Sequence, residues 1–256
     1  MTGLWMRDGR RLRALCLWLI AATFAVFALF PGIDPAVSAL FWNGHRFPVN
    51  TDPVIEALRD GLWNLCLLVF GLSVAAFLRA AIRGRDVLSL PIQLWAFFVA
   101  LFVAGPGVLV NLGLKAHWGR ARPFQTELFG GTARFTPPWD WTDQCASNCS
   151  FVSGEVSGAT ALAIVMGLAV WHLRARLPRP VFLVTLATAP ILPILSALQR
   201  VAAGRHFLSD AVLAMLFTAL VAILLYPRLM ERPATVRALS RWGAWLHRAL
   251  LGRDRP

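Results

Sequence analysis

Charged side chains are scarce in this sequence. Only 15% of its 256 residues are charged, whereas 57% are hydrophobic. A soluble domain of this length carries roughly a quarter charged residues. The charges are gathered into short clusters between long apolar stretches. This pattern excludes an ordinary soluble domain and is typical of a membrane protein with several spans.

Lysine is almost absent. Of the 25 basic residues, only Lys115 is a lysine, and the rest are arginines. The net charge of +12 would fit a nucleic-acid-binding protein, but the arginines gather at the ends of the apolar runs, where they indicate membrane orientation instead. Internal repeats, low-complexity runs and a second domain are also missing. We therefore expect one domain over residues 1–256 and no nucleic-acid partner.

Six apolar runs are long enough to cross a membrane as helices, so the sequence predicts an all-α integral membrane protein. The first run could also be a signal peptide, but no convincing small-x-small cleavage site follows it. The third run is uncharged for 28 residues, which predicts a long or tilted helix. Pro190 and Pro193 predict a kink in the fifth. The expected spans are residues 14–30, 61–78, 87–114, 156–173, 180–199 and 211–226.

Arginine clusters indicate the orientation. They lie at the N-terminus, after the second run, after the fourth run and in the tail, which six spans place on one side of the membrane. The positive-inside rule makes that side the cytoplasm, so both termini are expected there. The polar segments 115–155 and 200–210 then share the opposite, outer face, which is the periplasmic face if the protein lies in a bacterial inner membrane. Because the spans carry no charge, a transporter with a polar path across the membrane is disfavoured.

The tail has a helical pattern of its own at about residues 232–256. Apolar residues recur at helical spacing and arginines take the other face. The pattern predicts a basic amphipathic helix on the anionic inner leaflet, and an ordinary frayed tail is the alternative. The residues that carry it are Leu239, Trp242, Leu246, Leu250, Arg237, Arg241 and Arg248.

The later polar segment carries candidate catalytic groups. His206 and Asp210 are four residues apart and share one face if the sixth helix starts near His206. A carboxylate that holds one ring nitrogen of a histidine fixes its tautomer and frees the other nitrogen as a nucleophile or base. Arg200 lies six residues upstream, across a turn at Gly204, and a guanidinium can bind phosphate through two hydrogen bonds.

The earlier polar segment adds groups that bind anions. Lys115 ends the third span. Arg122 follows seven residues later, about two turns if the helix continues, before Pro123 limits it. Ser153 and Gly154 stand just before the fourth span, where backbone N–H groups can hold phosphate oxygens and glycine allows close approach. A phosphate site between the two segments is therefore expected.

Three motifs, Lys-x6-Arg-Pro, Ser-Gly and Arg-x5-His-x3-Asp, resemble in their order those of the type 2 phosphatidic acid phosphatase family. The resemblance implies a six-span phosphatase that acts on lipid phosphates without metal or cofactor. By that analogy His206 attacks phosphorus and forms a phosphohistidine, Asp210 orients it, and the other residues bind the phosphoryl oxygens. The matching residues are Lys115, Arg122, Pro123, Ser153, Gly154, Arg200, His206 and Asp210.

Glu155 departs from the family pattern, which has a histidine at this position to protonate the leaving oxygen. Three interpretations stay open. Glu155 is the acid, kept protonated by burial beside the lipid; or His117 serves instead; or Glu155 binds an amine or sugar of the substrate while water protonates the leaving group. Similar sequences with this glutamate resemble lipid A phosphatases, which makes lipid A or another envelope lipid the expected substrate.

Other functions remain open for the same residues. The lipid could be undecaprenyl pyrophosphate, phosphatidylglycerophosphate or phosphatidic acid. A phosphotransferase could pass the phosphoryl group from His206 to a second lipid. A transporter or a non-catalytic anion-binding membrane protein would bind phosphate without turnover.

The remaining polar residues of the two segments are expected to have structural roles. Arg120, Arg134 and Arg205 are expected to be anchors at the membrane surface. Cys145 and Cys149 are close enough in sequence for a tight disulfide in an oxidising compartment. A metal site at these cysteines is not expected, because no histidine or further cysteine lies nearby in the segment.

Overall fold

The computed structural model describes residues 2–230 and 233–251. These residues form helices and loops, with two isolated β-bridges and no strand. The predicted all-α fold with six spans is confirmed. Within the described residues, the helices long and apolar enough to cross a membrane are Gly9–Leu29, Pro53–Arg83, Ile92–His117, Gly154–Leu173, Arg179–Ala202 and Leu208–Met230.

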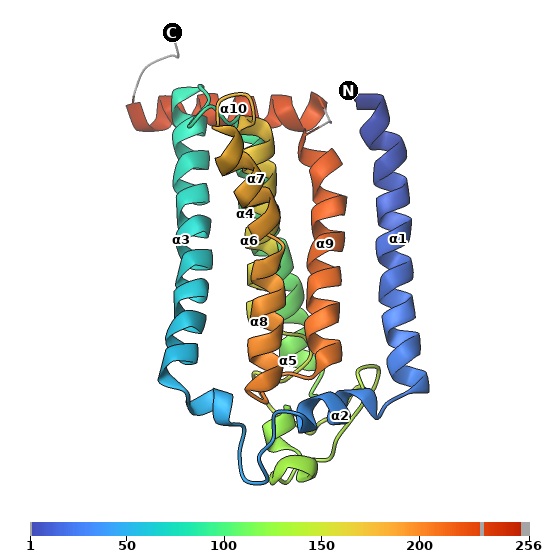
Figure 1. Cartoon of the computed structure of the whole chain (residues 1–256). Helices are drawn as coiled ribbons and strands as arrows, with labels where there is room; N and C mark the ends of the chain where they lie inside the picture. Colours follow the sequence, from blue (N-terminus) through green and yellow to red (C-terminus); the bar gives the residue numbers. More distant parts are fainter. Residues whose placement is uncertain (1, 231–232, 252–256) are drawn as a thin grey trace.

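The spans stand side by side as a bundle (Figure 1). The start of α1 and the last helix, α10 (Pro233–Leu251), lie at one end. The other end, which we call the loop end, carries the short helices α2 (Ile33–Ala39) and α5 (Lys115–His117). The spanning helices are α1 (Thr2–Leu29), α3 (Pro53–Arg83), α4 (Ile92–Phe102), α6 (Gly154–Leu173), α7 (Arg179–Thr188) with α8 (Ile191–Ala202), and α9 (Leu208–Met230).

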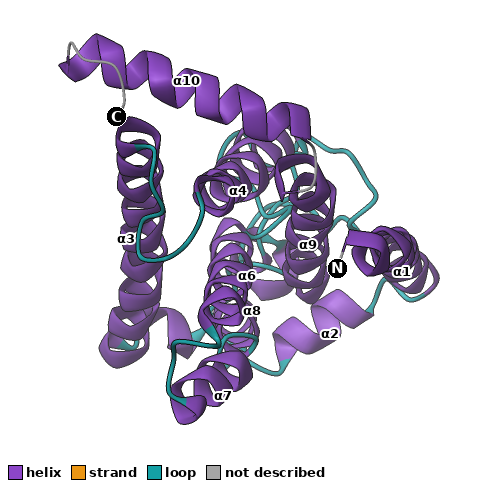
Figure 2. Cartoon of the chain, turned by 90° about the horizontal axis from the view of Figure 1, so that it is seen from above, coloured by secondary structure: helices purple, strands orange, loops and turns teal. Residues whose placement is uncertain are grey.

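Helix α6 lies near the middle of the bundle (Figure 2). It contacts α3, α8 and α9, and its buried residues include Gly158, Ala159 and Ala161. Small residues let membrane helices approach closely. The buried hydroxyl groups of Ser157 and Thr218 are 2.7 Å apart and hydrogen-bonded, which joins α6 to α9. The first turn of α6 is thereby joined to the middle of α9.

The third span is irregular where it approaches the loop end. After α4 it widens into a π-helical segment, Val103–Leu114, which contains Pro106. The side-chain amide of Asn111 donates a hydrogen bond of 2.7 Å to the Pro106 carbonyl. A Cβ added to Gly154 would lie 2.9 Å from the Asn111 side-chain oxygen. A side chain at this position would have to displace the Asn111 amide, and glycine avoids this where the start of α6 meets the third span.

The predicted start of the second span was wrong. Helix α3 begins at Pro53, well before the predicted residue 61. The Asp52 side chain caps it by accepting hydrogen bonds from the N–H groups of Val54 and Ile55 at 2.9 and 3.0 Å, and proline suits the first helical position. Arg59, which the sequence pattern left in a loop, therefore lies on α3.

The fifth span breaks where its prolines predict. Helix α7 ends at Thr188 and α8 begins at Ile191, with Pro190 between them, because proline has no N–H to continue the helical bonds. The third span starts at Ile92, later than the predicted residue 87. A turn in which Leu88 and Ser89 have positive φ angles precedes it.

The predicted tail helix is present as α10, which lies across the ends of the spans opposite the loop end (Figure 1). Trp242 stacks on Phe77 of α3 with ring centroids 5.5 Å apart, while Arg241 and Trp245 are exposed. Residues 232 and 252–256 of the predicted tail lie outside the described residues. Binding of this helix to an anionic leaflet stays a prediction.

Candidate active site

His206 lies in the short loop between α8 and α9 and is only 3% exposed. Its Nδ1 is 2.7 Å from the backbone carbonyl oxygen of Ser150. A carbonyl oxygen only accepts, so this contact places the proton on Nδ1 and leaves a lone pair on Nε2. His206 is therefore oriented as a nucleophile or base, as the sequence predicts, but by a backbone group.

Asp210 does not hold the ring directly, which corrects the expected contact. Its Oδ2 is 4.0 Å from Nδ1 of His206. The same oxygen accepts a hydrogen bond of 2.6 Å from the Ser150 hydroxyl and one of 2.9 Å from the backbone N–H of Phe207. Asp210 thus holds Ser150 in place, and the Ser150 carbonyl in turn orients the His206 ring. Ser150, which sequence reasoning missed, is the link between them.

Arg120 is not a surface anchor, and that prediction was wrong. Its side chain is 0% exposed and pairs with Asp210 at 2.6 Å and with Asp34 of α2 at 2.8 Å. Its Nε donates to the Thr136 carbonyl at 2.8 Å, and its guanidinium carbon lies 4.4 Å from the centre of the Phe207 ring. A buried charge needs such partners. Arg120 therefore holds Asp210 in place and does not anchor the chain at the membrane surface.

The predicted cations gather around His206. Burial lowers the pKa of His206 well below its usual 6.5, and the charges of Lys115, Arg122 and Arg200 lower it further. Backbone contacts bring their segments to the ring: the N–H of His206 donates to the Arg200 carbonyl at 3.3 Å, and the N–H of Cys149, next to Ser150, donates to the Lys115 carbonyl at 3.4 Å. The structure therefore brings the predicted cations and the predicted nucleophile together. A neutral imidazole among cations can attack an anion that those cations bind.

The start of α6 closes one side of this cluster. Ser153 is its N-cap, and the Ser153 hydroxyl accepts a hydrogen bond from the N–H of Val156 at 3.4 Å. The backbone N–H of Ser153 donates to the Asp210 carbonyl at 3.4 Å. Ser153 and Gly154 thus lie against the start of α9, as the motif order predicts. A helix start offers backbone N–H groups to an anion.

Arg122 is held by a disulfide-closed loop. Its Nε and Nη2 donate to the Asn148 carbonyl at 3.1 and 2.7 Å. Cys145 and Cys149 are joined in a disulfide bond, with Cα atoms 5.6 Å apart. The helix does not continue from Lys115 to Arg122, because it ends at His117 and Gly119 has φ of 71°. The loop, rather than a second helical turn, positions the Arg122 guanidinium.

Glu155 is engaged by two arginines, of which sequence reasoning missed one. Its Oε1 accepts from Arg59 Nη2 at 2.9 Å and from Arg200 Nη1 at 3.2 Å, and its Oε2 accepts from Arg59 Nε at 3.0 Å. The bond from Arg59 is bidentate, the strongest geometry for such a pair. Glu155 therefore stands between a predicted phosphate ligand and a cation on α3.

Arg200 has two further partners besides Glu155. Its Nε donates to the Gln199 side-chain oxygen at 2.5 Å, and its Nη2 donates to Glu56 Oε1 at 3.3 Å. The Gln199 amide donates to the same Glu56 oxygen at 3.0 Å. Three side chains from three helices thus fix the guanidinium of Arg200. A cap on α3 at Asp52 was the sequence signal that could have placed Glu56 and Arg59 on a helix.

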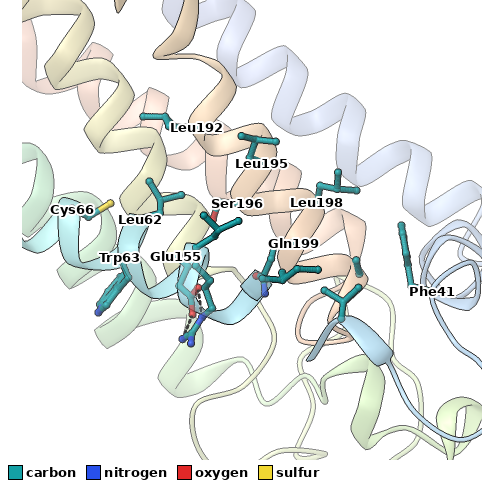
Figure 3. A pocket seen from close by; sticks show the side chains of 15 residues that line it. Phe41, Leu62, Trp63, Cys66, Glu155, Leu192, Leu195, Ser196, Leu198 and Gln199 are labelled. Carbon is teal, nitrogen blue, oxygen red and sulfur yellow. Dashed lines mark hydrogen bonds and ion pairs between the residues drawn. The ribbon is translucent and has the colours of Figure 1, made fainter. Parts of the chain in front are cut away.

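An apolar cavity of about 540 Å³ adjoins this network, between α3 and α8. Figure 3 shows Glu155 and Gln199 among the lining side chains, beside leucines from both helices and Trp63 of α3. The apolar lining includes Leu62, Trp63, Leu192, Leu195 and Leu198. The charged cluster and an apolar cavity are therefore neighbours at the loop end.

A buried histidine, a group of cations and an apolar cavity occur together in a six-span helical bundle. This combination defines an integral membrane phosphatase. The chain belongs to the PAP2 superfamily, whose model matches residues 90–233. The resemblance that the three motifs predict is confirmed.

Curated relatives agree with this class. The chain is 32% identical over 233 residues to a lipid A 4'-phosphatase of Rhizobium leguminosarum, covering 82% of this chain and 94% of that protein. It is 31% identical over 219 residues to a lipid A 4'-phosphatase of Francisella tularensis subsp. novicida, covering 83% and 94%. These matches extend beyond the three motifs to most of the chain.

A solved structure shares the fold. The crystal structure of a transmembrane PAP2-type phosphatidylglycerolphosphate phosphatase from Bacillus subtilis matches with a TM-score of 0.53 and 19% sequence identity. The match covers 88% of this chain and 98% of that one. At this identity the likeness concerns the arrangement of the helices.

Proposed function

We propose that the protein removes a phosphate group from a saccharide lipid such as lipid A, through a phosphohistidine at His206. The observation that carries the proposal is the hydrogen bond from Nδ1 to the Ser150 carbonyl. It leaves Nε2 unprotonated beside the segments that carry Lys115, Arg122 and Arg200. The names of the curated relatives support lipid A as the substrate.

The chemistry takes two steps. Nε2 of His206 attacks phosphorus, the N–P bond forms, the P–O bond to the sugar breaks, and the leaving oxygen takes a proton. Water then attacks phosphorus and gives up a proton, which replaces the proton that the leaving oxygen took; the N–P bond breaks, His206 is again neutral, and phosphate leaves. Lys115, Arg122 and Arg200 stabilise the charge on the phosphoryl oxygens in both steps, which is most of what phosphoryl transfer requires.

Glu155 acts in this proposal as a positioning residue for Arg200. Both of its oxygens already accept hydrogen bonds from guanidinium groups. A carboxylate in this arrangement is occupied as an acceptor and is poorly placed to donate a proton to the substrate. Water then supplies the proton to the leaving oxygen. The interpretations with Glu155 or His117 as the acid predict a different pH profile. The interpretation in which Glu155 binds an amine or sugar of the substrate would require it to share oxygens that Arg59 and Arg200 already engage.

The apolar cavity between α3 and α8 supports a lipid substrate. It lies beside Glu155 and Gln199 (Figure 3), so an acyl chain in the cavity would leave its polar end near Arg200. Burial of apolar chain stabilises such a complex by about 0.8 kcal/mol per CH₂ group. The cavity therefore gives a physical reason for acting on lipids rather than on soluble phosphate esters.

The loop end faces the periplasm in this proposal. The arginine clusters of the opposite end support it, because positive residues near spans stay in the cytoplasm. In this orientation the opposite end of the bundle, with α10, lies at the cytoplasmic face of the inner membrane.

The decisive experiment is phosphate release by the purified protein in detergent with EDTA present. Lipid A, undecaprenyl pyrophosphate, phosphatidylglycerophosphate and phosphatidic acid are compared, with His206→Ala as the control. We expect release from lipid A that survives EDTA, and an acid-labile, alkali-stable phosphoenzyme that His206→Ala abolishes. Release that requires an added acceptor lipid would identify a phosphotransferase. Binding of the lipids without release would refute turnover altogether.

A further inference from the structure

A second pocket lies at the loop end, on the far side of the segments that line the apolar cavity. It has a volume of about 280 Å³, close to the lower limit of about 300 Å³ for pockets that bind small molecules. It is lined by Trp42, His45, Arg46, Phe47, Asn50, Thr51, Phe124, Phe129, Gly130, Ala203 and Arg205. We call it the headgroup pocket.

The headgroup pocket and the apolar cavity share their dividing wall. Phe41 and Val49 line the cavity, whereas Trp42 and Asn50, the next residues in sequence, line the headgroup pocket. Likewise, Ala202 lines the cavity and Ala203 lines the headgroup pocket. An amphipathic molecule at the loop end would therefore find an apolar space on one side of these segments and a polar space on the other.

Arg205 connects the headgroup pocket to the active site, because it is the residue before His206. Its Nε donates to the Asn50 side-chain oxygen at 2.8 Å, and its guanidinium carbon lies 4.8 Å from the centre of the Phe124 ring. Burial lowers the pKa of Arg122, and the charge of Arg205 lowers it further. The backbone N–H of Phe124, two residues after Arg122, donates to the carbonyl of Gly204 at 3.1 Å, so Arg205 lies near the predicted phosphate ligand. The role of Arg205 as an anchor at the membrane surface stays a prediction, and these two contacts hold its side chain at the pocket.

The wall of the headgroup pocket next to the active site is rigid. Phe47 and Phe129 are buried, and both rings pack on Trp42 with centroids 5.0 and 5.8 Å away. A Cβ on Gly204 would lie 2.3 Å from the Phe47 ring, and Gly204 has φ of 65°. Phe47 thus packs directly on the backbone two residues before His206. A group held in this pocket has a fixed position relative to the nucleophile.

The chemistry of the pocket indicates its ligand. Arg46 and Arg205 provide positive charge, His45 adds a ring that donates or accepts hydrogen bonds, and none of the lining residues carries a carboxylate. Within the described part of the chain, Arg46 makes no ion pair, so its guanidinium has no competing anion. Guanidinium groups bind carboxylates and phosphates. Aromatic rings offer apolar faces beside polar groups, which suits a sugar ring.

We propose that the headgroup pocket binds the part of the lipid headgroup that lies beyond the reacting phosphate, and that this part is a sugar carrying an anionic group. The proposal rests on the proposed function, since it names the substrate class of the same site. Such a pocket would let the protein bind a saccharide lipid more tightly than a glycerol lipid such as phosphatidic acid, because the glycerol lipid has no sugar to place in the pocket.

The test measures binding separately from turnover. In the His206→Ala background, the dissociation constants of lipid A and of phosphatidic acid are measured in mixed micelles of one detergent. Arg46→Gln and Arg205→Gln each remove one guanidinium from the pocket. Arg134→Gln is the matched control, because Arg134 is exposed at the same end of the molecule and does not line the pocket. Melting temperatures show that each variant is folded.

We expect the ratio of the lipid A constant to the phosphatidic acid constant to rise about tenfold in Arg46→Gln and in Arg205→Gln, the loss of one charge-assisted hydrogen bond. Arg134→Gln should leave the ratio unchanged. An unchanged ratio in Arg46→Gln, an equal weakening of both lipids, or no measurable binding of lipid A would each overturn the proposal. Failure of the wild type to release phosphate from any lipid would instead refute the proposed hydrolysis, whatever the binding ratios are.

Discussion

The pairing of Arg59 with Glu155 predicts an unusual pattern in a double-mutant cycle. Arg59→Gln leaves the Glu155 carboxylate with Arg200 as its one guanidinium partner, which holds Arg200 away from the phosphate. Glu155→Gln removes the negative charge between Arg59 and Arg200, so the two guanidinium groups repel each other and Arg200 moves. Each single variant therefore disturbs the same phosphate ligand by unbalancing its charge.

The magnitude follows from the exposure of the pair. The side chains of Arg59 and Glu155 are 28% and 23% exposed, so water screens the pair and its contribution is far below that of a fully buried one. Glu56 and Gln199 still hold Arg200 in either single variant. We expect kcat/KM to fall about tenfold in each, or about 1.4 kcal/mol.

The double variant distinguishes coupling from independent effects. With both charges removed, the balance around Arg200 is restored, so kcat/KM should fall by no more than about tenfold, whereas independent losses would multiply to about a hundredfold. The assay is phosphate release from lipid A under initial-rate conditions. Glu127→Gln is a suitable control, because Glu127 is an exposed carboxylate in the same loop region. A hundredfold loss in the double variant would refute the reasoning.

The same variants separate positioning from acid catalysis. If Glu155 only positions Arg200, the pH profile of kcat/KM keeps its shape in Glu155→Gln and shifts down uniformly. If Glu155 donates the proton, the variant loses the descending limb of the profile. If His117 donates it, that limb disappears in His117→Gln and stays in Glu155→Gln.

Four further predictions follow from the site. Burial lowers the pKa of His206 well below 6.5, so Nε2 stays unprotonated as the pH falls from about 7 to about 6, where an ordinary histidine would become mostly charged. The rate of phosphoenzyme formation should therefore be flat over this range. A decline with a midpoint near 6.5 would contradict the assignment. Arg120→Leu leaves Asp34 and Asp210 buried without a cation, which should destabilise the fold by about 3–5 kcal/mol, measured by thermal unfolding in detergent; a melting temperature equal to that of Arg134→Leu would contradict this. Replacing both Cys145 and Cys149 by serine frees the loop that holds Arg122, so the KM for lipid A should rise about fivefold, the effect of about 1 kcal/mol, while wild type treated with reductant shows the same rise; an unchanged KM would mean that the disulfide is not needed to position Arg122. Leu195→Trp fills the apolar cavity and should lower kcat/KM for lipid A about tenfold, the effect of about 1.4 kcal/mol of lost apolar burial. Hydrolysis of a soluble aryl phosphate should be unchanged. An equal loss on both substrates would show that the cavity does not hold the acyl chain.

The spans and the motif residues could be predicted from the sequence because each depends on local pattern. Uncharged runs identify helices in lipid, where every backbone group must be paired within the helix. Lys115, Arg122, Arg200 and His206 could be placed together because the motif order and the number of spans bring their segments to one end. Both inferences need no knowledge of side-chain contacts.

The partners of these residues could not be predicted, because they depend on contacts between segments far apart. Arg59 was missed when the charges near it were taken as the end of a loop, although the Asp-Pro helix start before it was visible. Arg120 looked like other arginines near a span, and only its burial against Asp34 and Asp210 sets it apart. Ser150 acts through a backbone carbonyl, which no residue type reveals.

The pair that Arg120 makes with two aspartates has a consequence for biogenesis. Asp34 precedes Arg120 by 86 residues, and Asp210 follows it by 90, so the ribosome delivers the three groups at well-separated times. Until the last span enters the bilayer, Arg120 lacks one carboxylate and His206 has no fixed place. A nascent chain that stops before α9 thus carries the predicted phosphate-binding cations but lacks Asp210, so the predicted site forms only once α9 is in place.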